Sequence, residues 1–211
     1  MQQIIYKFLQ LQDYLVTLDA MKQFTKKRNV TTIDEIWFVE HPSVFTLGLG
    51  GLEHHILNAG NIPVVKTDRG GQVTYHGPGQ LIIYFLIDLI RRSLSVKQLI
   101  YIMQQAIIEL LHDKYNIHAN TKPNAPGVFI LEEKICSIGL KISKGCSYHG
   151  LSLNVDMNLE SFNQINPCGF KNLKMTQLSN INKTGKIYIH SVAEQLKDIF
   201  INKFDNLGYS Y

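Results

Sequence analysis

Apolar residues recur at spacings of three and four in three segments of the chain, which is the periodicity of amphipathic helices. The first segment is residues 9–28. The second and third each open with a pair that fits a capping box, Ser95 with Gln98 and Ser191 with Glu194. The apolar positions expected to face the core are Leu11, Leu15, Leu18, Met21, Phe24, Leu99, Ile102, Met103, Ala106, Ile107, Leu110, Leu111, Val192, Leu196, Ile199, Phe200 and Phe204.

Other segments are dense in β-branched, aromatic and aliphatic residues and predict strands. The run at residues 80–89 is nearly all apolar, which is typical of a strand covered on both faces. His41-Pro42 predicts a tight turn between the first two strands, and residues 123–127 predict a loop. The predicted strands are 35–40, 44–47, 80–89, 128–131, 134–142 and 148–155.

Helices before, between and after these strands predict an α+β (α/β) fold, a mixed sheet flanked by helices. A length of 211 residues suits a single domain, residues 1–211. The 45% hydrophobic content excludes intrinsic disorder. A net charge of +4, from 21 basic and 17 acidic residues, is too small to indicate nucleic-acid binding but suits acidic protein partners.

The chain shows no membrane or export signal. Its longest apolar run, residues 81–89, is interrupted by Tyr84 and Asp88 and is too short to span a bilayer. The N-terminus lacks the apolar segment of a signal peptide. Three cysteines without paired spacing argue against a disulfide framework and for a reducing compartment. We therefore expect a cytoplasmic protein without a membrane partner.

The segment Arg69-Gly-Gly-Gln-Val-Thr-Tyr-His-Gly-Pro-Gly-Gln80 concentrates glycines around a basic residue and a histidine. Glycines let backbone amides approach a ligand closely, so that the segment can wrap an anionic or carbonyl-bearing group. A glycine-rich hairpin with a hydrogen-bonded histidine is the alternative, and composition does not decide between them. The segment lacks the order of a P-loop or a dinucleotide fingerprint.

The cysteines differ in their surroundings. Cys136 lies in an apolar strand pattern and is expected to be a small buried hydrophobe. Cys146 lies in a predicted turn. Cys168 stands between Pro167 and Gly169, where a bent backbone can present its sulfur. A nucleophile also needs a neighbour that favours the thiolate, and without one Cys168 is a plain loop cysteine.

Metal binding is not expected. The close pairs, His54 with His55 and Cys136 with Cys146, lack the spacing of zinc ligands.

Three blocks resemble the octanoyltransferases of lipoate biosynthesis, the lipoyl(octanoyl) transferase B family. They are the glycine-rich segment 69–80, the stretch Lys134-Ile-Cys-Ser-Ile-Gly139 with Tyr148-His-Gly-Leu-Ser-Leu-Asn154, and Asn166-Pro-Cys-Gly169. Weaker matches are His41-Pro42 with Thr46-Leu47-Gly48, and Ala125-Pro-Gly-Val128. The blocks follow the family order over residues 35–180.

The resemblance implies the catalytic-domain fold shared by biotin- and lipoate-protein ligases. It implies transfer of an octanoyl group from octanoyl-acyl carrier protein to a lysine Nε of lipoyl domains. The acceptors would be the E2 subunits of 2-oxoacid dehydrogenases and the glycine-cleavage H protein. It implies Cys168 as the acyl carrier and Lys134 as its assistant, without a cofactor. Because a thioester donor is already activated, such a transfer needs no ATP.

The resemblance also implies the residues that contact substrate. Backbone amides near the glycines, or at Cys168 and Gly169, are candidate donors to the oxyanion, and the sequence does not choose among them. His76 and His149 are expected to orient loops. The implied substrate-binding residues are Arg69, Gly70, Gly71, Gln72, Val73, Thr74, Tyr75, His76, Ser137, Ile138, Gly139, Gly150, Leu151 and Ser152.

Lys134 has competitors. Alternation along the predicted strand points Lys134 and Lys141 to opposite faces, and only the family match selects Lys134. Two other functions also fit parts of the pattern. One is an ATP-dependent lipoate-protein ligase, which would not need Cys168. The other is an inactive scaffold that binds carrier proteins or lipoyl domains, which would need neither residue.

Overall fold

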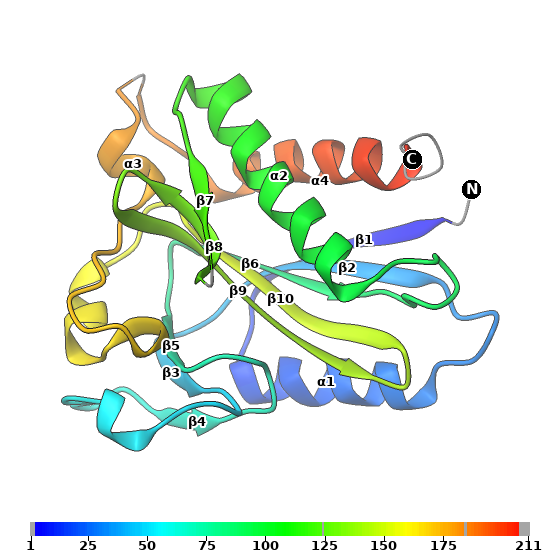
Figure 1. Ribbon diagram of the computed structural model, residues 1–211, viewed down its shortest axis with the longest axis horizontal. Coiled ribbons are helices and arrows are strands. Elements are labelled where there is room, and N and C mark those ends of the chain that lie inside the picture. The colour runs from blue at the N-terminus through cyan, green and yellow to red at the C-terminus, as the bar shows by residue number, and fades with distance from the viewer. Residues whose placement is uncertain (1–2, 124, 184, 207–211) are drawn as a thin grey trace.

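The structure is a computed structural model, which describes residues 3–123, 125–183 and 185–206 (Figure 1). Its strands are β1 (Ile4–Leu11), β2 (Asp34–Glu40), β3 (Val44–Leu47), β4 (Val64–Lys66), β5 (Val73–His76), β6 (Gln80–Leu86), β7 (Asn120–Lys122), β8 (Ala125–Ile130), β9 (Glu133–Ser143) and β10 (Cys146–Asn154). Its α-helices are α1 (Tyr14–Lys27), α2 (Val96–Tyr115), α3 (Leu178–Ile181) and α4 (Ile189–Asp205). Short 3-10 turns occupy Glu53–His55, Leu159–Gln164 and Pro167–Gly169.

Two sheets share the strands. The large sheet has the order β1-β2-β6-β10-β9-β8-β7 and is antiparallel except for the β1–β2 pair. The small sheet has the order β4-β3-β5, with β3 parallel to β4 and antiparallel to β5. Both sheets are therefore mixed, and the predicted α+β class is confirmed.

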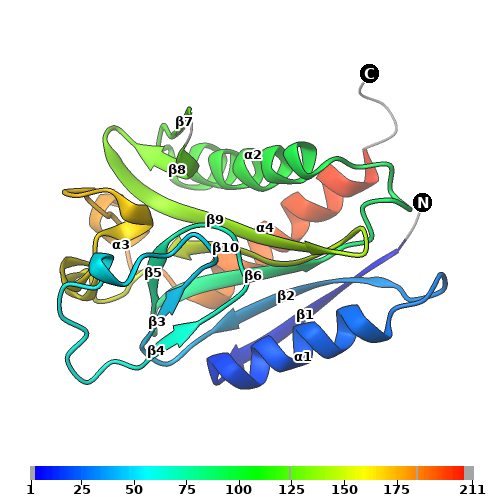
Figure 2. The same ribbon diagram turned by 60° about the horizontal axis from the view of Figure 1, so that its bottom comes forward.

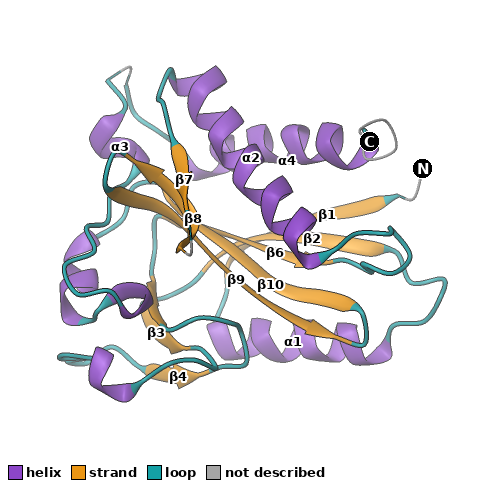
Figure 3. Cartoon of the chain, viewed as in Figure 1, coloured by secondary structure: helices purple, strands orange, loops and turns teal. Residues whose placement is uncertain are grey.

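Helices cover both faces of the large sheet. Helices α2 and α4 lie on one face, and α1 lies on the other (Figures 1 and 2). Strand β6 is buried along its whole length, as its apolar sequence predicts. Its alternate side chains Leu81, Ile83 and Phe85 join the core beneath α2 and α4, whereas Ile82 and Tyr84 join the core beside α1. The colouring by secondary structure in Figure 3 shows the same layers.

The predicted helix over residues 9–28 starts too early. Asp13 caps α1 by accepting hydrogen bonds from the amides of Leu15 (2.8 Å) and Val16 (3.1 Å). Residues 9–11 belong to β1, which pairs with β2. Leu11 and Leu15 are more than half exposed, at 54% and 55%, and are not core positions. The helical periodicity did not reveal this strand, because the strand that pairs with it, β2, lies more than twenty residues away in sequence.

The second predicted helix is confirmed. Ser95 and Gln98 form the capping box of α2, and all seven apolar positions expected to face the core are buried. In α4 the predicted apolar face is also buried, but the helix begins at Ile189. Tyr188 precedes it without a side-chain cap, so the predicted capping box of Ser191 and Glu194 is wrong.

Two strand predictions need correction. Residues 125–127, predicted as a loop, form the start of β8. The strands on either side of His41-Pro42 exist, but β2 belongs to the large sheet and β3 to the small one. The turn therefore passes the chain between sheets. Within the described residues, no helix is both long and apolar enough to cross a membrane.

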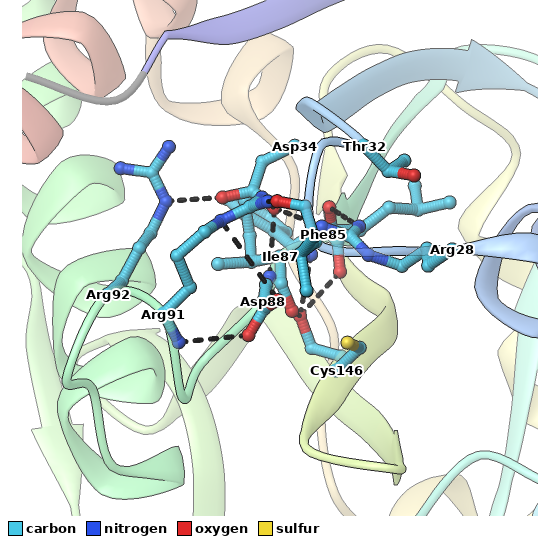
Figure 4. Close-up of polar contacts among 12 residues, drawn as sticks. Arg28, Thr32, Asp34, Phe85, Ile87, Asp88, Arg91, Arg92 and Cys146 are labelled. Atoms are coloured by element: carbon cyan, nitrogen blue, oxygen red, sulfur yellow. Dashed lines mark hydrogen bonds and ion pairs between the residues drawn. The ribbon is translucent and has the colours of Figure 1, made fainter.

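A buried carboxylate near the C-terminal end of β6 joins segments that are distant in sequence. Asp34 is fully buried (0% exposed) at the start of β2. It accepts a hydrogen bond from Arg28, and from Arg91 Nη2 at 2.7 Å. Arg92 Nε donates at 2.5 Å and the amide of Asp88 at 2.9 Å (Figure 4). One side chain thus ties the segment after α1 to the segment after β6.

Removing that carboxylate would leave buried guanidinium groups without their counter-ion. We expect Asp34→Ala to lower the free energy of unfolding by about 3–5 kcal/mol, measured by urea denaturation. Asp19→Ala, at an exposed position of α1, is the control and should change it by less than about 0.5 kcal/mol. Equal effects of the two variants would show that the cluster does not stabilise the fold.

Candidate active site

A cavity of about 470 Å³ lies between the large sheet and the glycine-rich segment. That volume falls in the range of small-molecule sites. Every residue implied as catalytic or substrate-binding lines it except Tyr75. The lining residues that correspond to those expectations are Arg69, Gly70, Gly71, Gln72, Val73, Thr74, His76, Lys134, Ser137, Ile138, Gly139, Gly150, Leu151, Ser152 and Cys168.

Tyr75 points away from the cavity. Its ring packs near Phe45 and Phe162, in the small core beneath β3, and its hydroxyl lies 2.9 Å from Ser43 Oγ. Side chains alternate along a strand, so Thr74 and His76 face the cavity while Tyr75 between them does not. The expectation that Tyr75 binds substrate does not agree with this placement.

Cys168 and Lys134 meet at the cavity wall. Lys134 Nζ donates hydrogen bonds to Cys168 Sγ and to the carbonyl oxygen of Pro126, both at 3.3 Å. Lys134 Nζ also lies 5.1 Å from the centre of the Phe129 ring. Lys134 is only 1% exposed, so these contacts replace its hydration.

The backbone at Cys168 presents its sulfur toward this lysine. Cys168 has φ +56° inside the short turn Pro167–Gly169, as a bent loop tip predicts. The other cysteines are in different surroundings. Cys136 is fully buried, and burial raises the pKa of its thiol to about 12. Cys146, predicted in a turn, is instead a buried residue at the start of β10.

The backbone of Lys134 is held from the side opposite β8. Its amide donates to the carbonyl oxygen of Lys174 at 2.9 Å, and its carbonyl oxygen accepts from the amide of Thr176 at 3.0 Å. The carbonyl oxygen of Thr176 in turn accepts from Asn154 Nδ2 at 2.9 Å. The segment after Cys168 therefore returns to fix the start of β9.

Buried hydrogen bonds continue from Asn154 to the glycine-rich segment. Gln80 Nε2 donates to Asn154 Oδ1, and Gln80 Oε1 lies 2.8 Å from His76 Nδ1. Because the amide nitrogen of Gln80 is used, His76 Nδ1 is the donor in that contact. His76 stays neutral, since burial, and then the neighbouring His41, lower its pKa to about 3. The expected role of His76 in orienting a loop is consistent with this chain of hydrogen bonds.

Arg69 is a buried guanidinium in the cavity wall. Its Nε donates to Thr46 Oγ1 at 3.1 Å, and its Nη2 donates to the carbonyl oxygen of Thr46 at 2.6 Å. Burial lowers its pKa. The backbone runs close by, and a Cβ at Gly48 would lie 2.4 Å from the carbonyl oxygen of Gly71, so only glycine fits there. These contacts hold the glycine-rich segment against β3.

His149 lines the cavity from β10 and pairs with Asp68. The ring Nε2 lies 2.9 Å from Asp68 Oδ1, and the Tyr148 hydroxyl donates to Asp68 Oδ2 at 2.5 Å. Burial lowers the pKa of His149, while the hydrogen bond with His149 holds the carboxyl pKa of Asp68 well below its usual range. His149 thus has a fixed orientation.

Several lining residues were not expected from the sequence. Ile82 and Tyr84 come from β6, whose uniform apolar character hid which face meets the cavity. Asp68 supports the site from just before the glycine-rich block, where no pattern marked it. The further lining residues are Tyr14, Ile82, Tyr84, Val96, Ile100, Ala125, Pro126, Leu140, Ile142, His149 and Phe170.

Two amides near the site are already used. The Gly169 amide donates to the carbonyl oxygen of Asn166 at 3.0 Å, and the Gly70 amide donates to that of Leu140 at 2.9 Å. Neither is free to bind an oxyanion in this conformation. Among the described residues, no group of three or more His, Cys, Asp or Glu is placed to hold a metal ion.

The fold is that of lipoate- and biotin-protein ligases. A putative lipoate protein ligase from T. acidophilum has a TM-score of 0.74 at 12% identity, covering 98% of this chain and 86% of its own. A biotin protein ligase from Aquifex aeolicus has a TM-score of 0.57 at 14% identity, covering 100% of this chain and 73% of its own. The predicted fold family is confirmed.

Relatives found by sequence share a much higher identity with this chain than these structures do. Residues 9–201 match the family model of the lipoyl protein ligase A/B catalytic domain. An octanoyltransferase from Psychromonas ingrahamii is 49% identical over 208 residues, which is 96% of each chain. One from Buchnera aphidicola is 52% identical over 184 residues, which is 87% of each chain. The chain therefore belongs to the octanoyltransferase family, and it is a transferase of protein lipoylation.

The buried neutral histidine predicts how stability depends on pH. Unfolded His76 takes up a proton below its ordinary pKa of 6.5, whereas folded His76 stays neutral down to about pH 3. The unfolded state binds more protons in this window, so the free energy of unfolding falls as the pH falls. We expect His76→Gln to reduce that slope by up to about 1.4 kcal/mol per pH unit, measured by urea denaturation between about pH 6 and 4.

His54→Gln, at an exposed position, is the control and should leave the slope as in the wild type. A slope that is unchanged in His76→Gln would contradict the buried, neutral state of His76.

Proposed function

We propose that the protein transfers an octanoyl group from octanoyl-acyl carrier protein to Cys168, and from Cys168 to the Nε of a lysine on a lipoyl domain. The acceptors are the lipoyl domains of 2-oxoacid dehydrogenase E2 subunits and the glycine-cleavage H protein. The observation that carries this proposal is the 3.3 Å contact between Lys134 Nζ and Cys168 Sγ at the cavity wall. A reducing cytoplasm would keep Cys168 as the free thiol that this chemistry needs.

In the first step, Lys134 holds the proton of the Cys168 thiol as an ammonium group. The Cys168 thiolate attacks the carbonyl carbon of the donor thioester, and a new carbon–sulfur bond forms. The donor carbon–sulfur bond breaks, and the leaving thiolate takes the proton from Lys134. The products are octanoyl-Cys168, the free donor thiol and a neutral Lys134 amine.

In the second step, the amine of the acceptor lysine attacks the octanoyl-Cys168 carbonyl. Lys134 takes a proton from the attacking nitrogen, and the Cys168 thiolate leaves. An amide has formed, and the ammonium–thiolate pair is restored. Both steps use Lys134 in the same place, and neither needs ATP, because the thioester donor is already activated.

The cavity supplies an apolar site for the acyl chain. Ile82, Leu140 and Ile142 are among its lining residues. Burying one methylene contributes about 0.8 kcal/mol, so an octanoyl chain gains roughly 5 kcal/mol. The lining residues from the glycine-rich segment, β9 and β10 are the proposed contacts to this chain and to the thioester.

The alternative of a lipoate-protein ligase is less well supported. A ligase activates free lipoate with ATP and does not use Cys168, so the contact between Lys134 and Cys168 would have no role. An inactive scaffold would leave the same contact unexplained.

Loss of the cysteine should abolish the acyl-enzyme. We expect octanoyl-acyl carrier protein to add one octanoyl group to the wild type without ATP, with the adduct mapped to Cys168 by mass spectrometry. Cys168→Ser should form no thioester, while Cys146→Ser, the control, should be acylated like the wild type. ATP-dependent modification of a lipoyl domain by Cys168→Ser would refute the proposal in favour of a ligase.

Loss of the lysine should slow both steps, because proton transfer by a positioned group contributes about 10²–10⁴-fold to a rate. We expect Lys134→Met to reduce both the acylation of Cys168 and its discharge to a lipoyl domain by about 100-fold or more. The two steps are measured separately by rapid quench. Lys141→Met, in the same strand, is the control, and wild-type rates in a folded Lys134→Met would disprove the role of Lys134.

A further inference from the structure

A second cavity, of about 430 Å³, adjoins the first one. Three wall residues, Ala125, Lys134 and Phe170, line both cavities. The second cavity is also lined by Lys171 and Lys174, from the segment that follows Cys168. We call it the lysine groove. Lys134 therefore stands between the acyl cavity and a separate space that the mechanism above does not use.

The lysine groove is strongly basic. Lys122, Lys134, Lys171 and Lys174 line it, against one carboxylate, that of Glu132. Lys122 pairs with Glu132 at 2.5 Å. The ion pairs found within residues 3–123, 125–183 and 185–206 include neither Lys171 nor Lys174. Both are exposed, so the groove presents uncompensated positive charge.

These charges are close to the reacting sulfur. Lys171 follows Cys168 by three residues, which limits the distance between their Cα atoms to about 11 Å. Lys174 is tied to Lys134, because its carbonyl oxygen accepts from the Lys134 amide at 2.9 Å. The exposed Phe170 lies between Cys168 and Lys171 in the sequence and provides an apolar wall.

Resting on the function proposed above, we infer that the lysine groove binds the thiol arm of the acyl donor, and that Lys171 and Lys174 bind a phosphate group on that arm. In the donor thioester, the acyl chain and the thiol arm extend from opposite sides of the reacting carbonyl. When the acyl chain fills the first cavity, the arm needs a second path. The groove offers one at Lys134, the group that protonates the leaving thiolate.

Charge distinguishes the donor from the acceptor in this groove. The thiol arms of acyl carrier proteins and of coenzyme A both carry phosphate, for which lysine is a point-charge partner. The acceptor instead brings a lysine side chain, whose ordinary pKa near 10.4 leaves it mostly cationic in solution. Lys171 and Lys174 attract the first and repel the second. The groove therefore binds the donor and acts in the first step of the reaction.

The test compares donors with and without phosphate. The double variant Lys171→Ala/Lys174→Ala and the wild type are acylated by octanoyl-pantetheine 4′-phosphate, octanoyl-coenzyme A, octanoyl-acyl carrier protein and octanoyl-pantetheine. We expect the second-order rate constant for Cys168 acylation to fall by about tenfold or more with the three phosphate-bearing donors, and by less than about twofold with octanoyl-pantetheine. Lys27→Ala/Lys114→Ala, at two exposed positions of α1 and α2, is the matched control and should behave as the wild type.

Several outcomes would overturn the inference. These are an equal loss with octanoyl-pantetheine, no loss with any phosphate-bearing donor, and a loss confined to the carrier protein, which would assign the lysines to its protein surface. In the double variant, discharge of octanoyl-Cys168 to a lipoyl domain should be unchanged. Slower discharge with normal loading would indicate that the groove binds the acceptor and not the donor. If no donor acylates the wild type, the proposed function itself fails.

Discussion

Burying the amino group of Lys134 is the constraint on which the rest of the site depends. An amine removed from water is costly unless its donors are satisfied, and here Cys168 Sγ and the Pro126 carbonyl oxygen lie at 3.3 Å. Both contacts require that the backbone segments carrying these atoms are placed accurately relative to one another. β8 supplies Pro126, and the chain after Cys168 returns to hydrogen-bond the backbone of Lys134 through Lys174 and Thr176. Cys168 and the backbone of Lys134 are thus held by one continuous segment.

The same constraint explains why several polar side chains are buried behind the site. Asn154 and Gln80 are almost fully buried, and their amides connect Thr176 to His76. A satisfied buried network stabilises one arrangement, since losing any member leaves an unpaired polar group. The glycine-rich segment and the start of β9 are therefore coupled, although about sixty residues separate them in sequence.

Much of the fold and of the candidate site was predictable wherever a local pattern or motif carries the information. The apolar run of β6, the stripe of α2 and the bent turn at Cys168 each follow from a few neighbouring residues. The rest depends on partners distant in sequence. β1 is a strand because β2 pairs with it, Asp34 is buried because three arginines surround it, and Tyr75 turns from the cavity because Phe45 and Phe162 lie beneath it. Periodicity alone also did not select Lys134 over Lys141.

The most direct test of the central claim is the kinetic competence of the acyl-enzyme. Octanoyl-Cys168 would be isolated, freed of donor and mixed with a lipoyl domain without ATP in a single-turnover experiment. We predict that octanoyl leaves Cys168 and appears on the acceptor lysine in equal amounts, at a rate no slower than steady-state turnover. Discharge slower than turnover, or to water alone, would contradict transfer through Cys168.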